Sequence, residues 1–202
     1  MRKLRATTFV TLDGVMQAPG GPGEDDEGGF RHGGWSVNFF DDQVGEAMGA
    51  FMGVPFDLVL GRRTYEIFSS YWPTASEEEG AKPLNDATKY VASRGRPQLD
   101  WERSVLLEGD VAEAVARLKQ GDGPELQVHG SGNLLQTLLR HGLVDEFQVL
   151  TFPVVVGEGK RLFAEGTIPA ALKLVESRVS PSGVVIGRYE PAGELVTGTF
   201  GS

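Results

Sequence analysis

Three short segments of the chain combine glycine with guanidinium or hydroxyl groups, and each directly follows a run of apolar residues. They are Gly61-Arg62-Arg63-Thr64, Ser93-Arg94-Gly95 and Gly130-Ser131-Gly132-Asn133. In an open α/β sheet, ligands bind outside the carboxyl ends of the strands, where the N–H groups at helix N-termini attract phosphate. Any one of these segments alone could be an ordinary turn between elements. The three together, two of them with arginine, predict a polyphosphate ligand.

Other chemistries have weaker support in the same residues. Leu135 stands where the dinucleotide-binding fingerprint of a Rossmann domain places its third Gly or Ala. Residues 157–161 lack the glycine spacing and the final Ser or Thr of a P-loop. No G-x-S-x-G motif of a hydrolase is present. Because the chain has no cysteine, and its three histidines have no metal-ligand spacing, we expect no metal site.

Strands and helices alternate in the elements that must position these segments. Period-two alternation and short apolar runs predict strands at residues 4–12, 57–60, 89–93, 104–107, 125–129, 146–156, 172–179 and 183–189. Helical spacing predicts helices at residues 41–52, 65–71, 110–120 and from Gly132 to Gly142. This order predicts an α/β fold with a mostly parallel central sheet, flanking helices and a C-terminal antiparallel hairpin.

We expect one domain over residues 1–190, because the length lies close to the usual range for a single domain. Residues 17–34 are rich in glycine and acidic side chains, which predicts a long mobile loop that could cover a site. The Gly- and Thr-rich residues 191–202 predict a flexible tail.

Six motifs occur in an order typical of one known family. They are L-D-G-V-M at 12–16, G-R-R-T-Y-E at 61–66, Y-V-A-S-R at 90–94, V-H-G-S-G at 128–132, V-D-E at 144–146 and P-V-V-V-G-E-G-K-R-L-F at 153–163. In this order the chain resembles the dihydrofolate-reductase-like family that includes the C-terminal reductase domain of the bifunctional riboflavin-biosynthesis protein. The resemblance covers about residues 4–190. It implies a dihydrofolate-reductase-like fold and NADPH as cofactor, and it does not imply a substrate.

The resemblance also implies roles for individual residues. Those expected to hold the cofactor's phosphates are Gly61, Arg62, Arg63, Thr64, Ser93 and Arg94, and those expected to cradle its pyrophosphate are Gly130, Ser131, Gly132 and Asn133. Val10, Leu12 and Met16 would border the nicotinamide. Because a guanidinium fork suits a phosphate dianion, NADPH is favoured over NADH. Lys160 and Arg161 are expected to close the long loop, an interpretation that we favour over a catalytic Lys160.

Reduction of a C=N or C=O bond by hydride also needs a proton. Dihydrofolate reductase takes it from a carboxylate on its first helix, a few residues after a tryptophan, so the resemblance nominates Asp41 or Asp42 after Trp35. Alternatively, Asp41 only caps the N-terminus of that helix. The spacing between Trp35 and Asp41 departs from the family pattern, which leaves the choice open.

The predicted function is an NADPH-dependent reductase that transfers hydride to a small heterocyclic or carbonyl substrate, of the ribosylaminopyrimidine type or the pterin type. The alternative is an NADPH-binding protein of the same fold with a regulatory role and no turnover. The net charge of −9 argues against a nucleic-acid partner. No apolar run has the length that a membrane span needs, and the N-terminus lacks the apolar stretch of a signal peptide. We therefore expect a cytoplasmic protein, and family similarity implies a homodimer.

Overall fold

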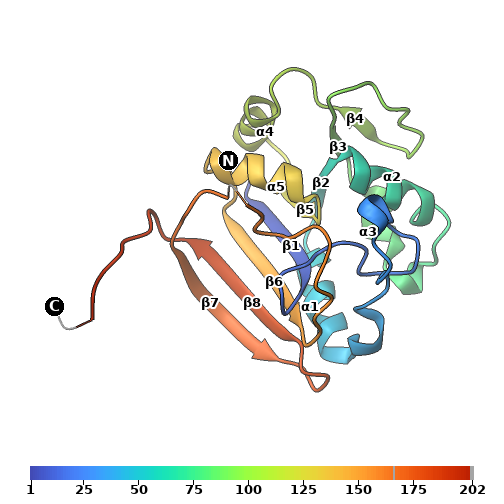
Figure 1. Ribbon diagram of the computed structural model, residues 1–202. Coiled ribbons are helices and arrows are strands. Elements are labelled where there is room, and N and C mark those ends of the chain that lie inside the picture. Colours follow the sequence, from blue (N-terminus) through green and yellow to red (C-terminus); the bar gives the residue numbers. More distant parts are fainter. Residues whose placement is uncertain (166, 201–202) are drawn as a thin grey trace.

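A single eight-stranded sheet forms the centre of the computed structural model, which describes residues 1–165 and 167–200 (Figure 1). The strands are β1 (Leu4–Thr11), β2 (Phe56–Gly61), β3 (Lys89–Ala92), β4 (Ser104–Leu106), β5 (Glu125–His129), β6 (Glu146–Phe152), β7 (Leu172–Val179) and β8 (Val185–Pro191). Their order is β4-β3-β2-β5-β1-β6-β8-β7. The first six are parallel, and β8 and β7 are antiparallel additions at one edge. The predicted α/β fold is confirmed.

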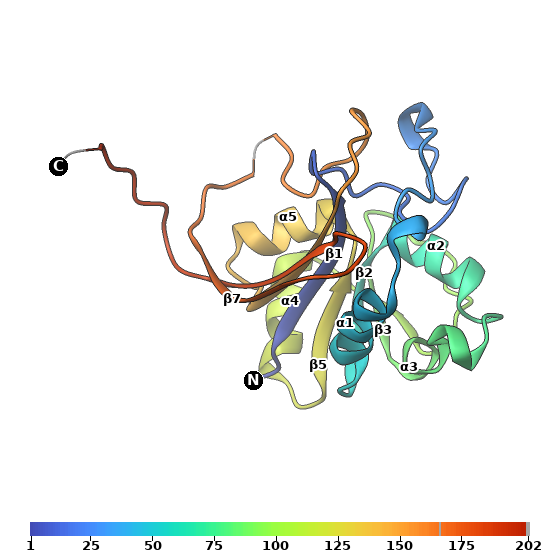
Figure 2. The ribbon, with the colours of Figure 1, turned by 90° about the horizontal axis from the view of Figure 1, so that it is seen from below.

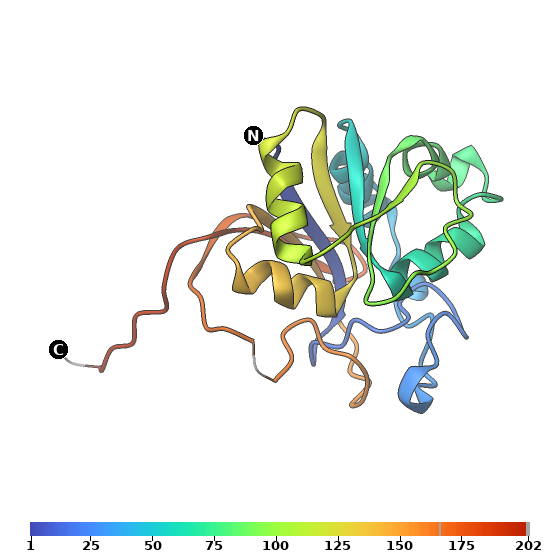
Figure 3. The ribbon, with the colours of Figure 1, turned by 90° about the horizontal axis from the view of Figure 1, so that it is seen from above.

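Helices cover both faces of the sheet (Figures 2 and 3). They are α1 (Asp42–Met52), α2 (Arg62–Tyr71), α3 (Ala81–Asp86), α4 (Val111–Gln120) and α5 (Gly132–Arg140), with short 3-10 turns η1 (Glu27–Gly29), η2 (Val37–Phe39) and η3 (Glu77–Glu79). Period-two alternation directs successive side chains to opposite faces. In β2, for example, Val59 joins the core beneath α4 and α5, whereas Leu58 and Leu60 join the core beneath α2 and α3. A third cluster joins α1 to β6 and β8.

Local chemistry explains most element boundaries. Asp110 accepts a hydrogen bond from the Glu113 backbone N–H and so caps α4, at the start of the predicted helix 110–120. The hairpin between β7 and β8 turns at Gly183, whose φ of 86° favours glycine. The sequence predicts a strand over residues 146–156 that is interrupted at Pro153; β6 ends at Phe152, directly before Pro153, which has no N–H to donate, and the strand does not resume after it. Helix α3 was not predicted, since a six-residue helix that contains Pro83 gives little periodicity.

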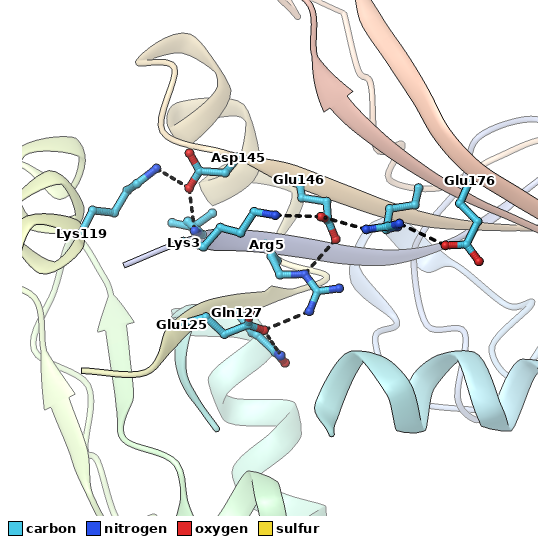
Figure 4. Close-up of polar contacts among 10 residues, drawn as sticks. Lys3, Arg5, Lys119, Glu125, Gln127, Asp145, Glu146 and Glu176 are labelled. Atoms are coloured by element: carbon cyan, nitrogen blue, oxygen red, sulfur yellow. Dashed lines mark hydrogen bonds and ion pairs between the residues drawn. The ribbon is translucent and has the colours of Figure 1, made fainter. Parts of the chain in front are cut away.

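The amino-terminal ends of β1, β5 and β6 are joined by ion pairs, several of which meet at the buried Glu146 (Figure 4). Glu146 accepts hydrogen bonds from Lys3 (3.1 Å), Arg5 (2.9 Å) and Arg188 (3.4 Å). Asp145 accepts hydrogen bonds from the Leu4 backbone N–H (2.7 Å) and the Lys119 ammonium (2.6 Å). Because both carboxylates have cationic partners, ion pairs hold the strands together at this end of the sheet and leave neither carboxylate free to bind a ligand.

The chain leaves the body of the molecule after β8, and residues 194–200 extend away from the sheet without a strand or helix (Figure 1). The last two residues of the predicted tail, 201 and 202, lie outside the described residues. Within the described ranges, no helix is long and apolar enough to span a membrane.

Candidate functional site

A large open cleft of about 2030 Å³ lies at the carboxyl ends of the parallel strands. All three segments singled out from the sequence line it, because β2, β3 and β5 are parallel and end at the same edge of the sheet. The lining includes each predicted phosphate-site and pyrophosphate-site residue, namely Gly61, Arg62, Arg63, Thr64, Ser93, Arg94, Gly130, Ser131, Gly132 and Asn133. The tertiary structure thus places segments up to 72 residues apart on one surface.

The turn after β5 has a constrained backbone. Gly130 and Ser131 both have positive φ, 55° and 53°, and a non-glycine residue in this region is uncommon. The Ser131 hydroxyl accepts a hydrogen bond from the Gly61 N–H (3.0 Å) and donates one to Thr64 (2.9 Å). A Cβ at Gly132 would lie 2.9 Å from the sulfur of Met16. These contacts tie the β5 turn to the β2 turn and to the start of the long loop.

Two helices begin at the cleft without a side-chain cap. The N-cap residues of α2 and α5, Gly61 and Ser131, make no capping hydrogen bond, whereas Asp41 and Asp110 cap α1 and α4. The first N–H groups of a helix have no partner inside the helix. At α2 and α5 these N–H groups and the positive ends of the helix dipoles therefore face the cleft. Helix N-termini of this kind bind phosphate in other proteins.

Six cationic side chains line the cleft: Arg62, Arg63, Arg94, Arg96, Lys160 and Arg161. Arg62 is engaged with Glu66 at 2.9 Å, an exposed pair that solvent screens. Arg94 and Arg96 form no ion pair in the part of the chain that the structure describes. Arg96 was not predicted, because a second arginine beyond the S-R motif carries no motif signal of its own. Unpaired guanidinium groups beside uncapped helices suit a polyanionic ligand.

The glycine-rich loop is held over the cleft by Asp25. This buried carboxylate contacts the Lys160 ammonium at 2.7 Å and Arg63 at 3.4 Å. Burial disfavours the charged form of Asp25, but the hydrogen bond and charge of Lys160 outweigh it, so the pKa of Asp25 is lowered. Gln17 adds hydrogen bonds from its side chain to the Asp25 and Glu27 carbonyls. Lys160 thus closes the loop, as the sequence predicts.

Neither predicted proton donor lines the cleft. The Asp41 carboxylate accepts hydrogen bonds from the N–H groups of Val44 (3.0 Å) and Ser182 (2.8 Å), and it so joins α1 to the β7–β8 turn. Desolvation opposes its ionisation, but the hydrogen bond from Ser182 and the others outweigh it and lower the pKa of Asp41. Asp42 is exposed on the first turn of α1. The structure therefore favours the capping interpretation of Asp41.

Of the three residues expected beside the nicotinamide, only one lines the cleft. Met16 lines the cleft, but Val10 is 6% exposed inside the core that includes α5, and Leu12 is 69% exposed outside the cleft. Thr7, Thr8 and Phe9 of β1 line the cleft instead. The sequence motif begins at Leu12, so no motif marks the residues of β1 that precede it. The packing of β1 against α5 decides which of these side chains reach the cleft.

His129, at the end of β5, is another cleft residue that the sequence did not identify as functional. Burial lowers its pKa to about 4, so the ring is neutral near pH 7. Its Nε2 lies 3.1 Å from Gln127 Oε1, and the rings of Phe51 and Phe68 approach it edge-on at 5.6 and 6.2 Å between centroids. A neutral, oriented imidazole in a cleft can accept or donate a hydrogen bond to a ligand.

Comparison with known proteins identifies the family. The profile of the RibD C-terminal domain matches residues 2–186. The chain belongs to the RibD C-terminal domain family. Two relatives from Bacillus subtilis (strain 168) are similar along most of their length. The uncharacterized protein YyaP is 30% identical over 91% of this chain and 92% of its own, and the uncharacterized protein YwjB is 31% identical over 86% and 89%.

Solved structures show the same fold at lower identity. A candidate riboflavin biosynthesis protein from Shewanella sp. PV-4 superposes with a TM-score of 0.72 at 21% identity, covering 94% of this chain and 98% of its own. A pyrimidine reductase-like protein from Corynebacterium diphtheriae has a TM-score of 0.62 at 13% identity, covering 96% of this chain and 93% of its own. Dihydrofolate reductase from Enterococcus faecalis, complexed with NADP(H) and RAB-propyl, has a TM-score of 0.57 at 16% identity, covering 94% of this chain and 96% of its own. This RibD C-terminal domain thus has a dihydrofolate-reductase-like fold, and its family supports a reductase-type function.

Proposed function

We propose that this protein is an NADPH-dependent reductase that transfers hydride to a small heterocyclic or carbonyl substrate. The observation that carries the proposal is the convergence on one cleft of two uncapped helix N-termini and six cationic side chains. When bound, NADPH would supply a hydride that, with one proton, reduces a C=N or C=O bond and leaves NADP⁺. A dinucleotide with a 2′-phosphate has the charge that this surface would neutralise.

The residues present fit such a group. The N–H groups that begin α5 would hold the pyrophosphate, because Ser131 is engaged with Gly61 and Thr64 and leaves them free. Gly132 leaves room in this cradle, since a Cβ there would displace the end of the Met16 side chain. Arg62, Arg63 and Arg94 would hold the 2′-phosphate.

A proton must reach the reduced bond, and Glu24 is the cleft carboxyl group best suited to supply it. Burial raises the pKa of Glu24, although the N–H groups of Gly20 (2.6 Å) and Gly21 (3.2 Å) partly offset this. A raised pKa keeps a larger fraction of the acid protonated near neutral pH. Asp25 is less suited, because Lys160 lowers its pKa. In this proposal Glu24→Gln reduces the rate of turnover while NADPH binding is retained.

Titration of the purified protein with NADPH tests the proposal directly. We expect tryptophan fluorescence to change and the melting temperature to rise, because a ligand that binds only the folded state stabilises it by mass action. If neither quantity responds to NADPH at about 1 mM, a concentration far above typical cofactor affinities, the proposal is wrong.

The 2′-phosphate assignment has its own test in Arg62→Ala. We expect about a tenfold loss of NADPH affinity and little change for NADH, since a charge-assisted hydrogen bond contributes about 1.5 kcal/mol or more and Glu66 already competes for this exposed side chain. Arg117→Ala is the matched control, because Arg117 forms a similar i,i+4 pair with Glu113 and lies outside the cleft. Equal losses for NADPH and NADH would remove the assignment.

A second candidate function is an NADPH-binding regulatory protein without turnover. The observation that favours it is the capping role of Asp41, which leaves the acid nominated by the family resemblance outside the cleft. This candidate predicts NADPH binding without oxidation by any pyrimidine, pterin or carbonyl compound. A panel that monitors NADPH absorbance at saturating cofactor separates the two functions.

We also propose that the protein forms a homodimer in solution. Strand β7 is the edge of the sheet, and it carries exposed apolar side chains, with Leu174 50% and Val179 63% exposed. Unpaired edge strands with exposed apolar side chains are surfaces at which a second chain can pair.

A further inference from the structure

One end of the cleft differs in chemistry from the cationic part. We call it the apolar end, and it is lined by Thr7, Met48, Met52, Phe68, Trp72 and His129. These residues form one continuous surface: Thr7 pairs with His129 in the sheet register, and its hydroxyl lies 4.0 Å from the sulfur of Met48. Phe68 lies 6.0 Å from Trp72 and 6.2 Å from His129 between ring centroids.

The apolar end contains no cationic side chain. All six cations of the cleft lie at the N-terminus of α2, after β3, or in the loop before residue 162. Phe68 is six residues beyond Arg62 along α2, which separates their backbones by about 9 Å. A phosphate seated among methionine and aromatic side chains would lose its hydration without gaining a counter-charge, which is costly. The apolar end therefore disfavours a phosphorylated ligand.

Besides the Thr7 hydroxyl, which faces the Met48 sulfur, the polar group at this end is the imidazole of His129. The Gln127 side-chain amide donates to the Phe51 carbonyl (2.7 Å) and to Glu125 (2.7 Å), so its oxygen is the atom that faces His129 Nε2. An amide oxygen only accepts, so Nε2 carries the ring proton and Nδ1 is the acceptor. Among the described residues, every buried side-chain nitrogen or oxygen has a partner, and Nδ1 makes no hydrogen bond. Nδ1 is therefore not fully buried, and His129 lines the cleft although only 7% of the residue is exposed.

We propose that the substrate is an uncharged, unphosphorylated planar ring compound whose N–H or O–H group donates a hydrogen bond to His129 Nδ1. Met48, Met52, Phe68 and Trp72 supply polarizable contacts to such a ring. The assignment rests on the proposed function, in which the cofactor takes the cationic part of the cleft. It separates this protein from an enzyme that recognises a ribosylaminopyrimidine phosphate by its phosphate.

The test compares ring compounds in matched pairs that differ only in a phosphate ester. The set includes a ribosylaminopyrimidine and its 5′-phosphate, together with amino- and oxo-substituted pyrimidines and pteridines with and without a phosphorylated tail. Isothermal titration is run on the full-length protein saturated with NADP⁺, after NADP⁺ binding has been measured alone. We expect the best uncharged compound to bind about tenfold more tightly than its phosphate ester. Tighter or equal binding of the esters, or no binding of any uncharged ring below about 10 mM, would overturn the proposal.

Two variants probe the residues themselves. His129→Phe keeps a ring and removes the acceptor, and it should weaken donor-bearing rings about three- to tenfold without changing NADP⁺ affinity. Met52→Lys, at a half-buried position on the last turn of α1, introduces a cation and should shift preference toward the phosphate esters by about tenfold. Unchanged selectivity in Met52→Lys and unchanged ring affinity in His129→Phe would refute the assignment. If NADP⁺ itself does not bind, the proposed function fails instead, so the two failures are distinct.

Discussion

Replacement of Glu146 by glutamine tests whether the ion pairs at the amino end of the sheet stabilise the fold. The Glu146 side chain is 2% exposed and accepts hydrogen bonds from three cations, of which Arg5 is 13% exposed (Figure 4). Breaking a buried ion pair costs about 3–5 kcal/mol. Since Arg5 retains Glu125 and Lys3 is half-exposed, we take the lower value, about 3 kcal/mol. In a chain of this length that corresponds to a fall in melting temperature of about 6–12 °C.

Glu176→Gln is the matched control for this prediction. Glu176 contacts one member of the same group, Arg188, at 3.1 Å, but its side chain is 58% exposed. Exposed pairs contribute about 0–1 kcal/mol, so its melting temperature should fall by no more than about 4 °C. Calorimetry or circular dichroism at pH 7 measures both variants. Equal shifts in the two variants would refute the reasoning that burial makes the Glu146 contacts strong.

The pH dependence gives a second readout on Glu146. Burial disfavours its charged form, but the hydrogen bond from Lys3 and the charge of Arg5 outweigh this, so the folded-state pKa lies below the ordinary value. The stabilisation is therefore fully present above the unfolded pKa of about 4.3 and is lost as pH falls through the lower folded value. As pH falls through that lower folded-state value, the stabilities of the wild type and Glu146→Gln should converge. NADPH affinity should be the same in both, because the cleft lies at the opposite end of the strands.

Three further predictions address other parts of the molecule. The pKa of His129 falls from about 6.5 to about 4 on folding, because burial disfavours the charged ring. The free energy of unfolding should therefore decrease as pH falls from 6.5 toward 4, by about 2 kcal/mol at pH 5. Unfolding titrations of His129→Gln should lack this pH-dependent decrease. Asp25→Asn should release the glycine-rich loop and so increase tryptic cleavage at the exposed Arg31 about fivefold. Asp26→Asn, which removes no ion pair among the described residues, should leave the cleavage rate unchanged. Equal rates in the two variants would show that the ion pairs of Asp25 do not hold the loop. Sedimentation should show a dimer for the wild type and a monomer for Leu174→Lys, and a monomeric wild type would remove the homodimer proposal.

The sequence by itself determines the order of the elements and the chemistry of the strand-end turns. The short apolar runs of β2 and β5, the Asp110 cap and the glycine of the β7–β8 turn are local signals, because each depends on residues close in the chain. The parallel sheet then follows from the alternation of strands and helices, and with it the convergence of the three turns at one edge. The sequence alone could therefore predict that these three turns share one surface, the one we propose for the cofactor's phosphates.

Only the tertiary structure decides what depends on burial and on partners far along the chain. Asp41 is occupied by an N–H group of Ser182, 141 residues away, so its spacing from Trp35 could not show whether it reaches the cleft. Val10 enters the core because α5 packs on that face of β1. His129 becomes a neutral acceptor because aromatic rings remove water from it and Gln127 orients it, which no motif records. Local sequence sets which groups are present, whereas long-range packing sets their charge, orientation and access to a ligand.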